Sequence, residues 1–251
     1  MNSPQVPQIF DRRQSAAKWE RARSRQRLGA ASYLIDTMAG DIVERLGFMR
    51  FEPKNALIIG EAKGELQASL TAKGTTGNVA LLGHFEEEQP GPPEMFDLIV
   101  HLLGLGMVND LPGALIHARN ALAPGGLFIA AFPGAGSMPV LRSIALEADG
   151  ERPAARMHPL VDNRAATGLM ERAGFKRQVV DSYPIRVRYP SLRRIVNDLR
   201  DHGLTRSLAS PVPPLNRQWL ERAEAAFDPL REGDGKVVET FEILVLTGWR
   251  D

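Results

Sequence analysis

Short apolar runs alternate along this chain with longer stretches in which apolar residues recur every three or four positions. The runs have the length of strands buried on both faces, and they occupy residues 56–59, 78–83, 96–100 and 127–131. The spacing typical of helices covers residues 29–46, 64–72, 110–122, 162–174, 191–202 and 217–227. This alternation predicts an α/β fold, a mostly parallel sheet covered by helices, with ligands outside the carboxyl ends of its strands.

The C-terminal half is expected to complete this domain rather than to add a second one. Its extended segments are predicted at residues 175–180, 185–189 and 237–247. In the middle of the chain, Asp110 and Pro112 mark the start of a helix, because Asp caps helix N-termini and Pro is tolerated in the first turn. If Asp110 is only a cap, its presence says nothing about catalysis.

The composition narrows the classes of function. The 251 residues include 43% hydrophobic and 24% charged residues, as in ordinary globular proteins, and the net charge is +1. We therefore expect no bulk affinity for DNA or for an anionic membrane. The absence of cysteine excludes disulfides, thiolate metal sites and cysteine nucleophiles. No apolar run approaches the roughly 20 residues of a membrane span, so a cytoplasmic protein is expected.

The N-terminal region is strongly basic. Between Asp11 and Arg27 only Asp11 and Glu20 oppose the basic residues Arg12, Arg13, Lys18, Arg21, Arg23, Arg25 and Arg27. Three interpretations are open: a mitochondrial transit peptide, a basic arm that contacts an acidic partner or RNA, and a solvated helix face that precedes the fold. The two acidic residues and the lack of a clear amphipathic pattern argue against a transit peptide and favour the solvated helix face.

The first strand leads into a glycine-bearing loop. Gly60, Glu61, Ala62, Lys63 and Gly64 follow the apolar residues 56–59 and precede a helix. Free N–H groups converge at such a helix N-terminus and can bind an anion or a nucleotide. The dinucleotide pattern needs three glycines, so a nicotinamide dehydrogenase is disfavoured. Glycine in such a turn can also serve the backbone alone.

Several longer motifs carry a family resemblance. They read Gln8-Ile9-Phe10-Asp11-Arg12, Phe96-Asp97-Leu98-Ile99-Val100, Val108-Asn109-Asp110-Leu111-Pro112, Leu122-Ala123-Pro124-Gly125-Gly126-Leu127-Phe128, Arg172-Ala173-Gly174-Phe175, Val187-Arg188-Tyr189-Pro190, Asn197-Asp198-Leu199-Arg200, Thr240-Phe241-Glu242-Ile243 and Thr247-Gly248-Trp249. With them the chain resembles class I S-adenosylmethionine (SAM) methyltransferases. It most resembles the methyltransferase-like assembly factors of respiratory complex I from mitochondria and alphaproteobacteria, a family with an arginine hydroxylase among its members.

The resemblance implies a Rossmann-like fold with a seven-strand type of sheet, mostly parallel, and an antiparallel hairpin at one edge. It divides the chain into a basic arm at residues 1–28 and a methyltransferase-like domain at residues 29–251, with a helical lid insert around 185–230. The span from Gly64 to Asp97 is short for a complete second and third strand.

The resemblance also implies a set of site residues. SAM would contact Gly60, Glu61, Ala62, Gly64, Glu86 and Leu103, and Asn109 and Asp110 would lie beside the transferred methyl group. The loop departs from the family pattern, because Ile58 and Ala62 stand where relatives carry an acidic residue and a glycine. No histidine spacing indicates a metal.

Two functions follow from this resemblance. The first is a SAM-dependent enzyme that modifies a protein side chain, linked to complex I assembly. The second is a non-catalytic derivative that has lost SAM and binds a protein partner, for which a complex I subunit is the candidate. The altered loop favours the second, and the central motifs fit either. The cell compartment would be the bacterial cytoplasm, or the mitochondrial matrix in a eukaryote. The arginine-rich lid region suits an acidic partner or is a solvated face.

Overall fold

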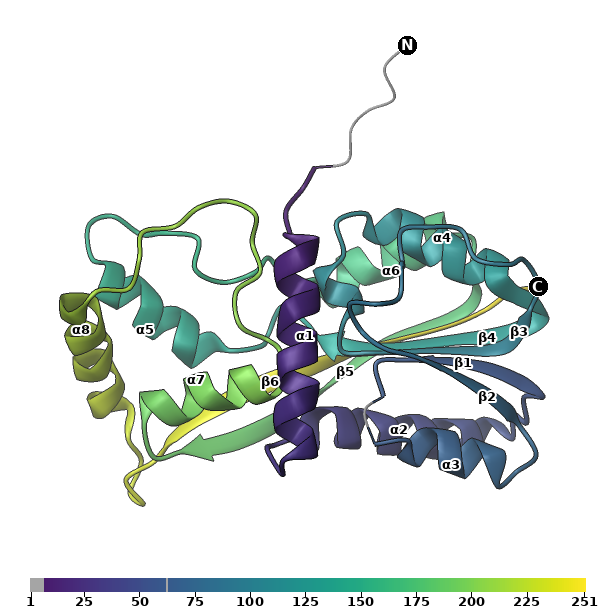
Figure 1. The fold of residues 1–251 in the computed structure, drawn as a ribbon, viewed down its shortest axis with the longest axis horizontal. Coiled ribbons are helices and arrows are strands. Elements are labelled where there is room, and N and C mark those ends of the chain that lie inside the picture. Colours follow the sequence, from purple (N-terminus) through teal and green to yellow (C-terminus); the bar gives the residue numbers. More distant parts are fainter. Residues whose placement is uncertain (1–6, 62) are drawn as a thin grey trace, which may run out of the picture.

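The protein is described by a computed structural model over residues 7–61 and 63–251. Its centre is a sheet with the strand order β2-β1-β3-β4-β6-β5 (Figure 1). The strands are β1 (Asn55–Ile59), β2 (Thr76–Ala80), β3 (Phe96–Leu102), β4 (Leu122–Pro133), β5 (Lys176–Tyr189) and β6 (Val237–Trp249). The pairs from β2 to β4 are parallel, and β6 runs antiparallel to both β4 and β5. The expected Rossmann-like architecture with an antiparallel edge is confirmed.

The sheet differs from the seven-strand type in one place. Its described part has six strands, because residues 81–95 form turns and no strand between β2 and β3. This is the span that the sequence identifies as short. The two extended segments predicted at 175–180 and 185–189 are one strand, β5. Pro184 lies inside it and is tolerated because β5 pairs on one side only.

Helices cover both faces of the sheet. They are α1 (Arg12–Arg27), α2 (Tyr33–Met49), α3 (Glu65–Thr71), α4 (Leu111–Ala121), α5 (Pro139–Asp149), α6 (Asn163–Arg172), α7 (Leu192–Asp201) and α8 (Arg217–Phe227), with 3₁₀ turns at Leu105–Met107 and Asp228–Leu230. In Figure 1, α2 and α3 lie on one face of the sheet and α4 and α6 on the other. The sequence pattern did not predict α5.

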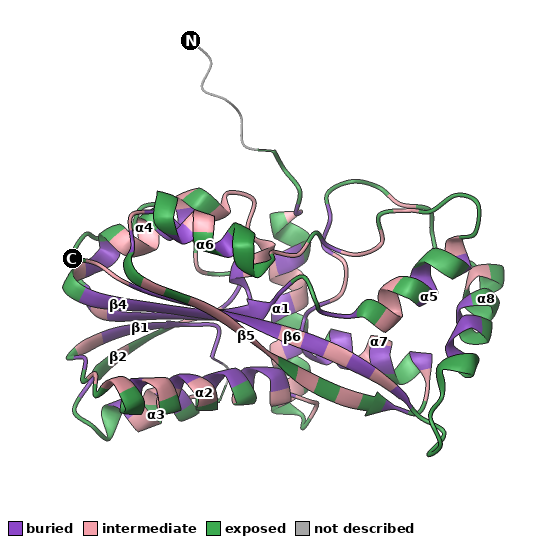
Figure 2. Ribbon diagram, turned by 180° about the vertical axis from the view of Figure 1, so that it is seen from behind, coloured by how far each residue is buried: buried purple, intermediate pink, exposed green. Residues whose placement is uncertain are grey.

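A helical lobe lies at one end of the sheet. Strands β5 and β6 have 14 and 13 residues, against five in β1, so they continue past the shorter strands. Figure 1 shows α5, α7 and α8 gathered around this extension. Figure 2 shows the buried core following the central strands and continuing along β6 toward the lobe. We call this region, α5 to α8 without α6, the lobe.

Helix α1 stands between the lobe and the rest of the sheet (Figure 1). The sequence favours a solvated helix here, but Trp19 and Ala22 are buried. The Trp19 ring packs so closely on Gly203 that a Cβ there would lie 2.4 Å from it. Arg25 forms an ion pair of 2.5 Å with Asp201 at the end of α7. These contacts hold α1 against the fold, while most of its basic side chains face solvent.

Candidate functional site

The turn after β1 needs glycine for reasons internal to the chain. Gly60 has φ +96°, and a Cβ on it would lie 2.4 Å from the backbone oxygen of Leu102 and 3.2 Å from Cγ of Leu82. No side chain fits at that distance from a backbone atom, and the positive φ is itself unfavourable for other residues. Gly60 is therefore a special backbone position, as the sequence indicates, with packing as its cause.

Leu82 fills the space between the carboxyl ends of β1 and β3. Its side chain is 4% exposed and lies against Gly60 on one side and Gly104 on the other, where a Cβ would meet Cδ2 of Leu82 at 2.4 Å. The crevice outside the carboxyl ends of neighbouring strands is where open α/β sheets bind ligands. Here a leucine from the chain itself occupies that crevice.

Helix α1 closes the same place from outside. The Nη1 atom of Arg23 donates to the backbone oxygen of Leu82 at 2.7 Å. Ala16 packs on Gly83, where a Cβ would lie 2.6 Å from its Cα. The cavity left among α1, Gly60 and Leu82 has a volume of about 10 Å³. That is room for about one water molecule.

Glu61 serves the N-terminus of α3. Its buried carboxylate accepts hydrogen bonds from the N–H groups of Leu66 and Gln67, the latter at 3.0 Å. An anionic ligand would need those same N–H groups. Gly64 precedes the helix with φ +77°. Ala62, the third loop residue in the predicted site, lies outside the described residues.

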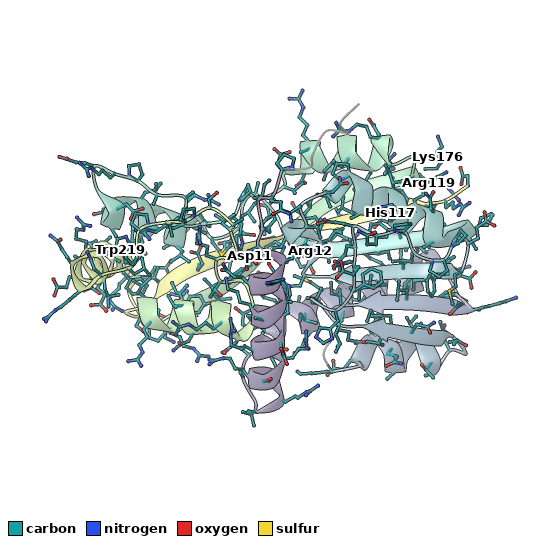
Figure 3. All side chains as sticks on the ribbon, turned by 45° about the horizontal axis from the view of Figure 1, so that its top comes forward. Asp11, Arg12, His117, Arg119, Lys176 and Trp219 are labelled. Carbon is teal, nitrogen blue, oxygen red and sulfur yellow. The ribbon has the colours of Figure 1, made fainter. Side chains whose placement is uncertain are left out.

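Glu86 and Leu103, which the resemblance predicts to contact SAM, have partners within the protein. The Glu86 carboxylate forms an ion pair with Arg12 of α1. Arg12 and Glu86 line a cavity of about 230 Å³ between α1 and the end of β3, and Met107 lines it as well. Leu103 is buried and donates its N–H to the oxygen of Ala131 at 2.7 Å. Figure 3 labels Arg12 near one end of α1.

The two predicted catalytic residues have structural bonds. The Asn109 Oδ1 atom accepts from the N–H groups of Ile9 and Phe10, both at 2.8 Å, and its Nδ2 atom donates to the oxygen of Phe10 at 3.2 Å. Asp110 caps α4 by accepting from the N–H of Gly113 at 2.9 Å. Asn109 thus holds the segment before α1, and Asp110 plays the capping role that the sequence left open.

The sequence did not indicate the buried pair of an acid and a histidine that lies near this edge. The Nε2 atom of His101 lies 3.2 Å from Oε1 of Glu87, and both side chains are largely buried. Burial opposes ionisation of Glu87, but the hydrogen bond and charge of His101 outweigh it, so the pKa of Glu87 is lowered. The pair borders an apolar cavity of about 190 Å³ beneath α4. Glu87 is one of three consecutive glutamates and His101 lies inside a strand, so nothing in the local sequence indicates that they contact each other.

The comparison with family models identifies the fold family. A model described as a methyltransferase domain matches residues 30–180. The chain belongs to this family. The arginine-hydroxylase NDUFAF5 of Rattus norvegicus is 28% identical over 99% of this chain and 79% of its own length. The protein of the same name from Mus musculus is 32% identical over 66% of this chain and 49% of its own length, so the match spans about half of that relative. The resemblance found in the motifs is confirmed.

A solved structure supports the same fold. The 1,6-didemethyltoxoflavin-N1-methyltransferase of Burkholderia thailandensis, bound to 1,6-didemethyltoxoflavin and S-adenosylhomocysteine, has a TM-score of 0.51 with this protein. The two chains are 14% identical, and the match covers 100% of this chain and 93% of that one. At this identity the likeness shows the fold alone.

The cofactor that the family implies does not fit the residues present. Pockets for cofactors and small ligands have volumes of roughly 300–1,000 Å³. The glycine-loop cavity has about 10 Å³, and the cavity over β3 has about 230 Å³. Leu82 and α1 fill the crevice beside Gly60, and the Glu61 carboxylate accepts from the N–H groups at the start of α3. No group of three or more metal-ligand side chains occurs in residues 7–61 and 63–251. Within the same residues, no helix combines the length and apolarity needed to cross a membrane.

Proposed function

We propose that this protein is a non-catalytic member of the methyltransferase family, which has lost SAM and acts by binding a protein partner. The observation that carries this proposal is the closed carboxyl edge, where Leu82 and α1 leave about 10 Å³ beside Gly60. A pocket that is filled by apolar side chains of the same chain stabilises the fold through burial, so it opposes entry of a polar ligand.

The relatives suggest the setting of this activity. The protein is related to NDUFAF5 along almost its whole length, and we propose that it takes part in the assembly of respiratory complex I. Its partner would then be a complex I subunit. The compartment would be the bacterial cytoplasm or, in a eukaryote, the mitochondrial matrix. The division into an arm at residues 1–28, a domain at 29–251 and a lid around 185–230 stays a prediction.

SAM-dependent modification of a protein side chain is the second candidate function. The family match favours it, since the matched residues 30–180 include the loop and the strands that hold SAM in such enzymes. It requires α1 to leave the fold and Leu82 to move. That movement would break the contacts of Trp19 and Arg25 described above.

Calorimetric titration of SAM and S-adenosylhomocysteine into the full chain separates the two functions. We expect no binding at about millimolar ligand and no rise in melting temperature, whereas a ligand at 100 times its Kd would stabilise by about 2.7 kcal/mol. A SAM-binding methyltransferase in the same buffer is the positive control. Binding in the micromolar range would overturn the proposal.

Complementation tests the role of the predicted catalytic residue. In cells that lack the gene, the wild-type chain and Asp110→Asn should restore assembled complex I equally, because Asn keeps the helix cap. Blue-native electrophoresis measures the complex. A folded Asp110→Asn protein that fails to restore assembly would favour the enzyme. If the wild-type chain restores nothing, the link to complex I is wrong.

A further inference from the structure

The lobe contains a cavity that is larger than the two at the carboxyl ends of β1 and β3. Its volume is about 520 Å³, within the range of small-ligand pockets. Apolar side chains from α5, α7, α8 and the adjoining loops form much of its wall, among them Leu141, Ala145, Val196, Leu199, Leu204 and Trp219. Such a wall suits the apolar body of a ligand.

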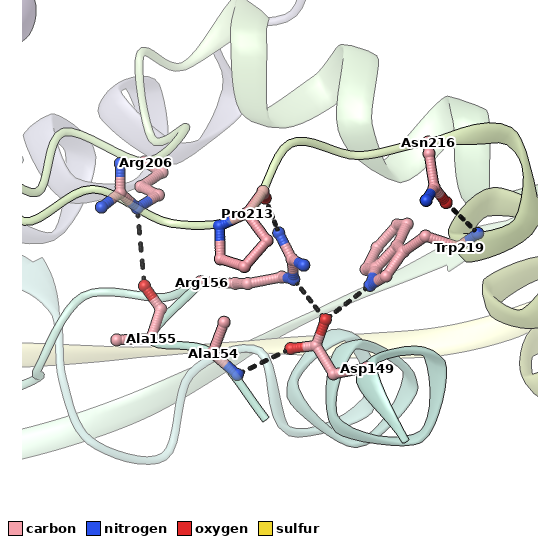
Figure 4. Close-up of polar contacts among 8 residues, drawn as sticks. All are labelled: Asp149, Ala154, Ala155, Arg156, Arg206, Pro213, Asn216 and Trp219. Carbon is pink, nitrogen blue, oxygen red and sulfur yellow. Dashed lines mark hydrogen bonds and ion pairs between the residues drawn. The ribbon is translucent and has the colours of Figure 1, made fainter. Parts of the chain in front are cut away.

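A buried carboxylate fixes the frame of this cavity (Figure 4). Asp149 at the end of α5 accepts from Nε of Arg156 at 2.6 Å, from Nε1 of Trp219 at 2.8 Å and from the N–H of Ala154 at 2.9 Å. Arg156 also donates to the oxygen of Pro213 at 2.9 Å. One carboxylate thus joins α5, α8 and two loops, and it neutralises Arg156.

The other cations on the wall have no such partner. Lys18, Arg200 and Arg206 line the cavity, no carboxylate does, and none of the three forms an ion pair within the described residues. Arg206 donates to the backbone oxygens of Ala155 and Ser210. These acceptors are neutral oxygens, so they do not compensate the charge of Arg206.

Lys18 likewise has neutral oxygens as its hydrogen-bond acceptors. Its Nζ atom donates to the oxygen of Thr205 and to Oγ of Ser207, both at 3.1 Å. Burial, followed by the charges of Arg206 and Arg21, lowers the pKa of Lys18 to about 8, and Asp11 opposes this only weakly. The folded protein therefore disfavours the charge on Lys18, and an anion in the cavity would relieve that.

We propose that the lobe cavity binds an amphipathic organic anion, whose apolar body lies against the leucine and tryptophan wall and whose head group lies at Lys18 and Arg206. A carboxylate or a phosphate ester provides this chemistry, because both accept charge-assisted hydrogen bonds from Lys and Arg. The site lies away from the glycine loop, so the inference does not depend on the proposed loss of SAM.

Four probes distinguish the two parts of the site, the apolar wall and the cationic head-group position. Decanoate and decyl phosphate carry both body and charge, decanol lacks the charge, and acetate lacks the body. Titration into the full chain is followed by calorimetry and by fluorescence, with Trp219→Phe as the control that removes the tryptophan in the wall. We expect saturable binding of decanoate, decyl phosphate or both, at least about tenfold tighter than decanol or acetate. The tighter of the two anions identifies the head group.

Matched variants test the location. Arg206→Gln and Lys18→Gln should each weaken binding of the anion by about tenfold, with Arg193→Gln, an exposed arginine outside the wall, as the control. Leu215 lines the cavity and is 62% exposed, whereas Leu220 on α8 does not line it and is 48% exposed. Both tolerate substitution, so Leu215→Glu should weaken binding by repulsion and Leu220→Glu should leave it unchanged.

The proposal has clear opposing outcomes. No saturable binding of either anion, decanol binding as tightly as the tighter of the two anions, or full affinity in a folded Arg206→Gln protein would each overturn it. So would equal effects of Leu215→Glu and Leu220→Glu. Binding of an acidic peptide without binding of either anion would replace the small ligand with a protein segment.

Discussion

The carboxyl edge of the sheet, where β1 and β3 end, and the lobe cavity differ in how their polar side chains are paired. At the edge, the residues expected to hold a cofactor have partners within the chain: Glu61 caps α3, Glu86 pairs with Arg12, and Leu82 fills the crevice beside Gly60. In the lobe, Lys18 and Arg206 have only neutral oxygens as partners. Both residues are partly buried, and a partly buried cation without an opposite charge favours binding of an anion. The glycine loop, the expected cofactor motif, therefore lies at the closed site. The open cavity lies in the arginine-rich lid region, for which the sequence suggested an acidic partner but no cavity.

Helix α1 contributes to both regions. Its Trp19 and Arg23 cover the edge, and Lys18, on another side of the same helix, borders the lobe cavity. Trp219 and Arg12 are labelled in Figure 3 on the lobe and near the end of α1. A change that loosens α1 would therefore open the first site and alter the second.

The largest expected effect is on the frame of the lobe. Asp149→Ala leaves the charge of Arg156 and the Trp219 N–H without an acceptor, and we expect it to lower the free energy of unfolding by about 3–5 kcal/mol. Urea denaturation measures this. Glu147→Ala, on the exposed side of the same helix, is the control. A loss below about 1 kcal/mol would mean that the cavity is not held by this carboxylate.

The lobe should also weaken in acid. His158 Nε2 accepts from the N–H of Ser207 at 2.8 Å, and burial, with Lys18 and Arg206, lowers the pKa of His158 to about 4 from 6.5. The unfolded state therefore binds a proton below pH 6.5 that the folded state refuses. The contribution of His158 to the free energy of unfolding is complete above pH 6.5. It is lost as the pH falls toward 4, by on the order of 3 kcal/mol.

Denaturation at a series of pH values in wild-type protein and in His158→Gln measures that contribution. The variant should show a flatter dependence between pH 6.5 and 4. His84→Gln, at an exposed histidine, should keep the wild-type slope. Equal slopes in wild type and His158→Gln would assign the acid sensitivity to other groups.

At the carboxyl edge, Gly60→Ala should destabilise the protein by about 2–3 kcal/mol without any ligand present. The reason is the positive φ and the 2.4 Å contact of a Cβ with the Leu102 oxygen. Gly91→Ala, in a loop with no atom within 4 Å of the added Cβ, is the control. A Gly60→Ala protein as stable as the wild type would mean that this glycine is not required by packing.

The smallest expected effect concerns the predicted catalytic residue. Asp110→Ala should cost about 1 kcal/mol through loss of the cap on α4, and Asp110→Asn should be nearly neutral, because Asn also caps helices. Thermal denaturation measures both. Two variants with equal losses would contradict a capping role.

Local patterns predicted most elements and missed one helix. The helix predicted at 217–227 is α8 with the same bounds, and the strand predicted at 96–100 is β3. The missed helix is α5, although Pro139 in its first turn and Gly150 just after its end are local signals of a helix. What the sequence does not contain is the partner of its N-terminus. Glu239, a fully buried residue far away in β6, accepts from the N–H of Leu141 at 2.7 Å.

The candidate site was predictable in its position but not in its state. The sequence predicted the turn at Gly60. It also indicated an altered SAM-binding loop, because Ile58 and Ala62 depart from the family pattern. It did not show that Leu82, predicted as part of a strand, would lie in a turn and fill the crevice. It also did not show that Asn109 would hold the segment before α1.

The sequence by itself determined the family, the parallel core and the special backbone at Gly60, because apolar periodicity and short motifs are local properties. Only the tertiary structure decided that the cofactor crevice is closed and that the lobe holds a cavity with uncompensated cations. Those facts depend on contacts between residues that are distant along the chain, Trp19 with Gly203, Lys18 with Thr205 and Leu82 with Gly104. Whether a charge or a crevice is satisfied is a property of its neighbours in space, and no local pattern records them.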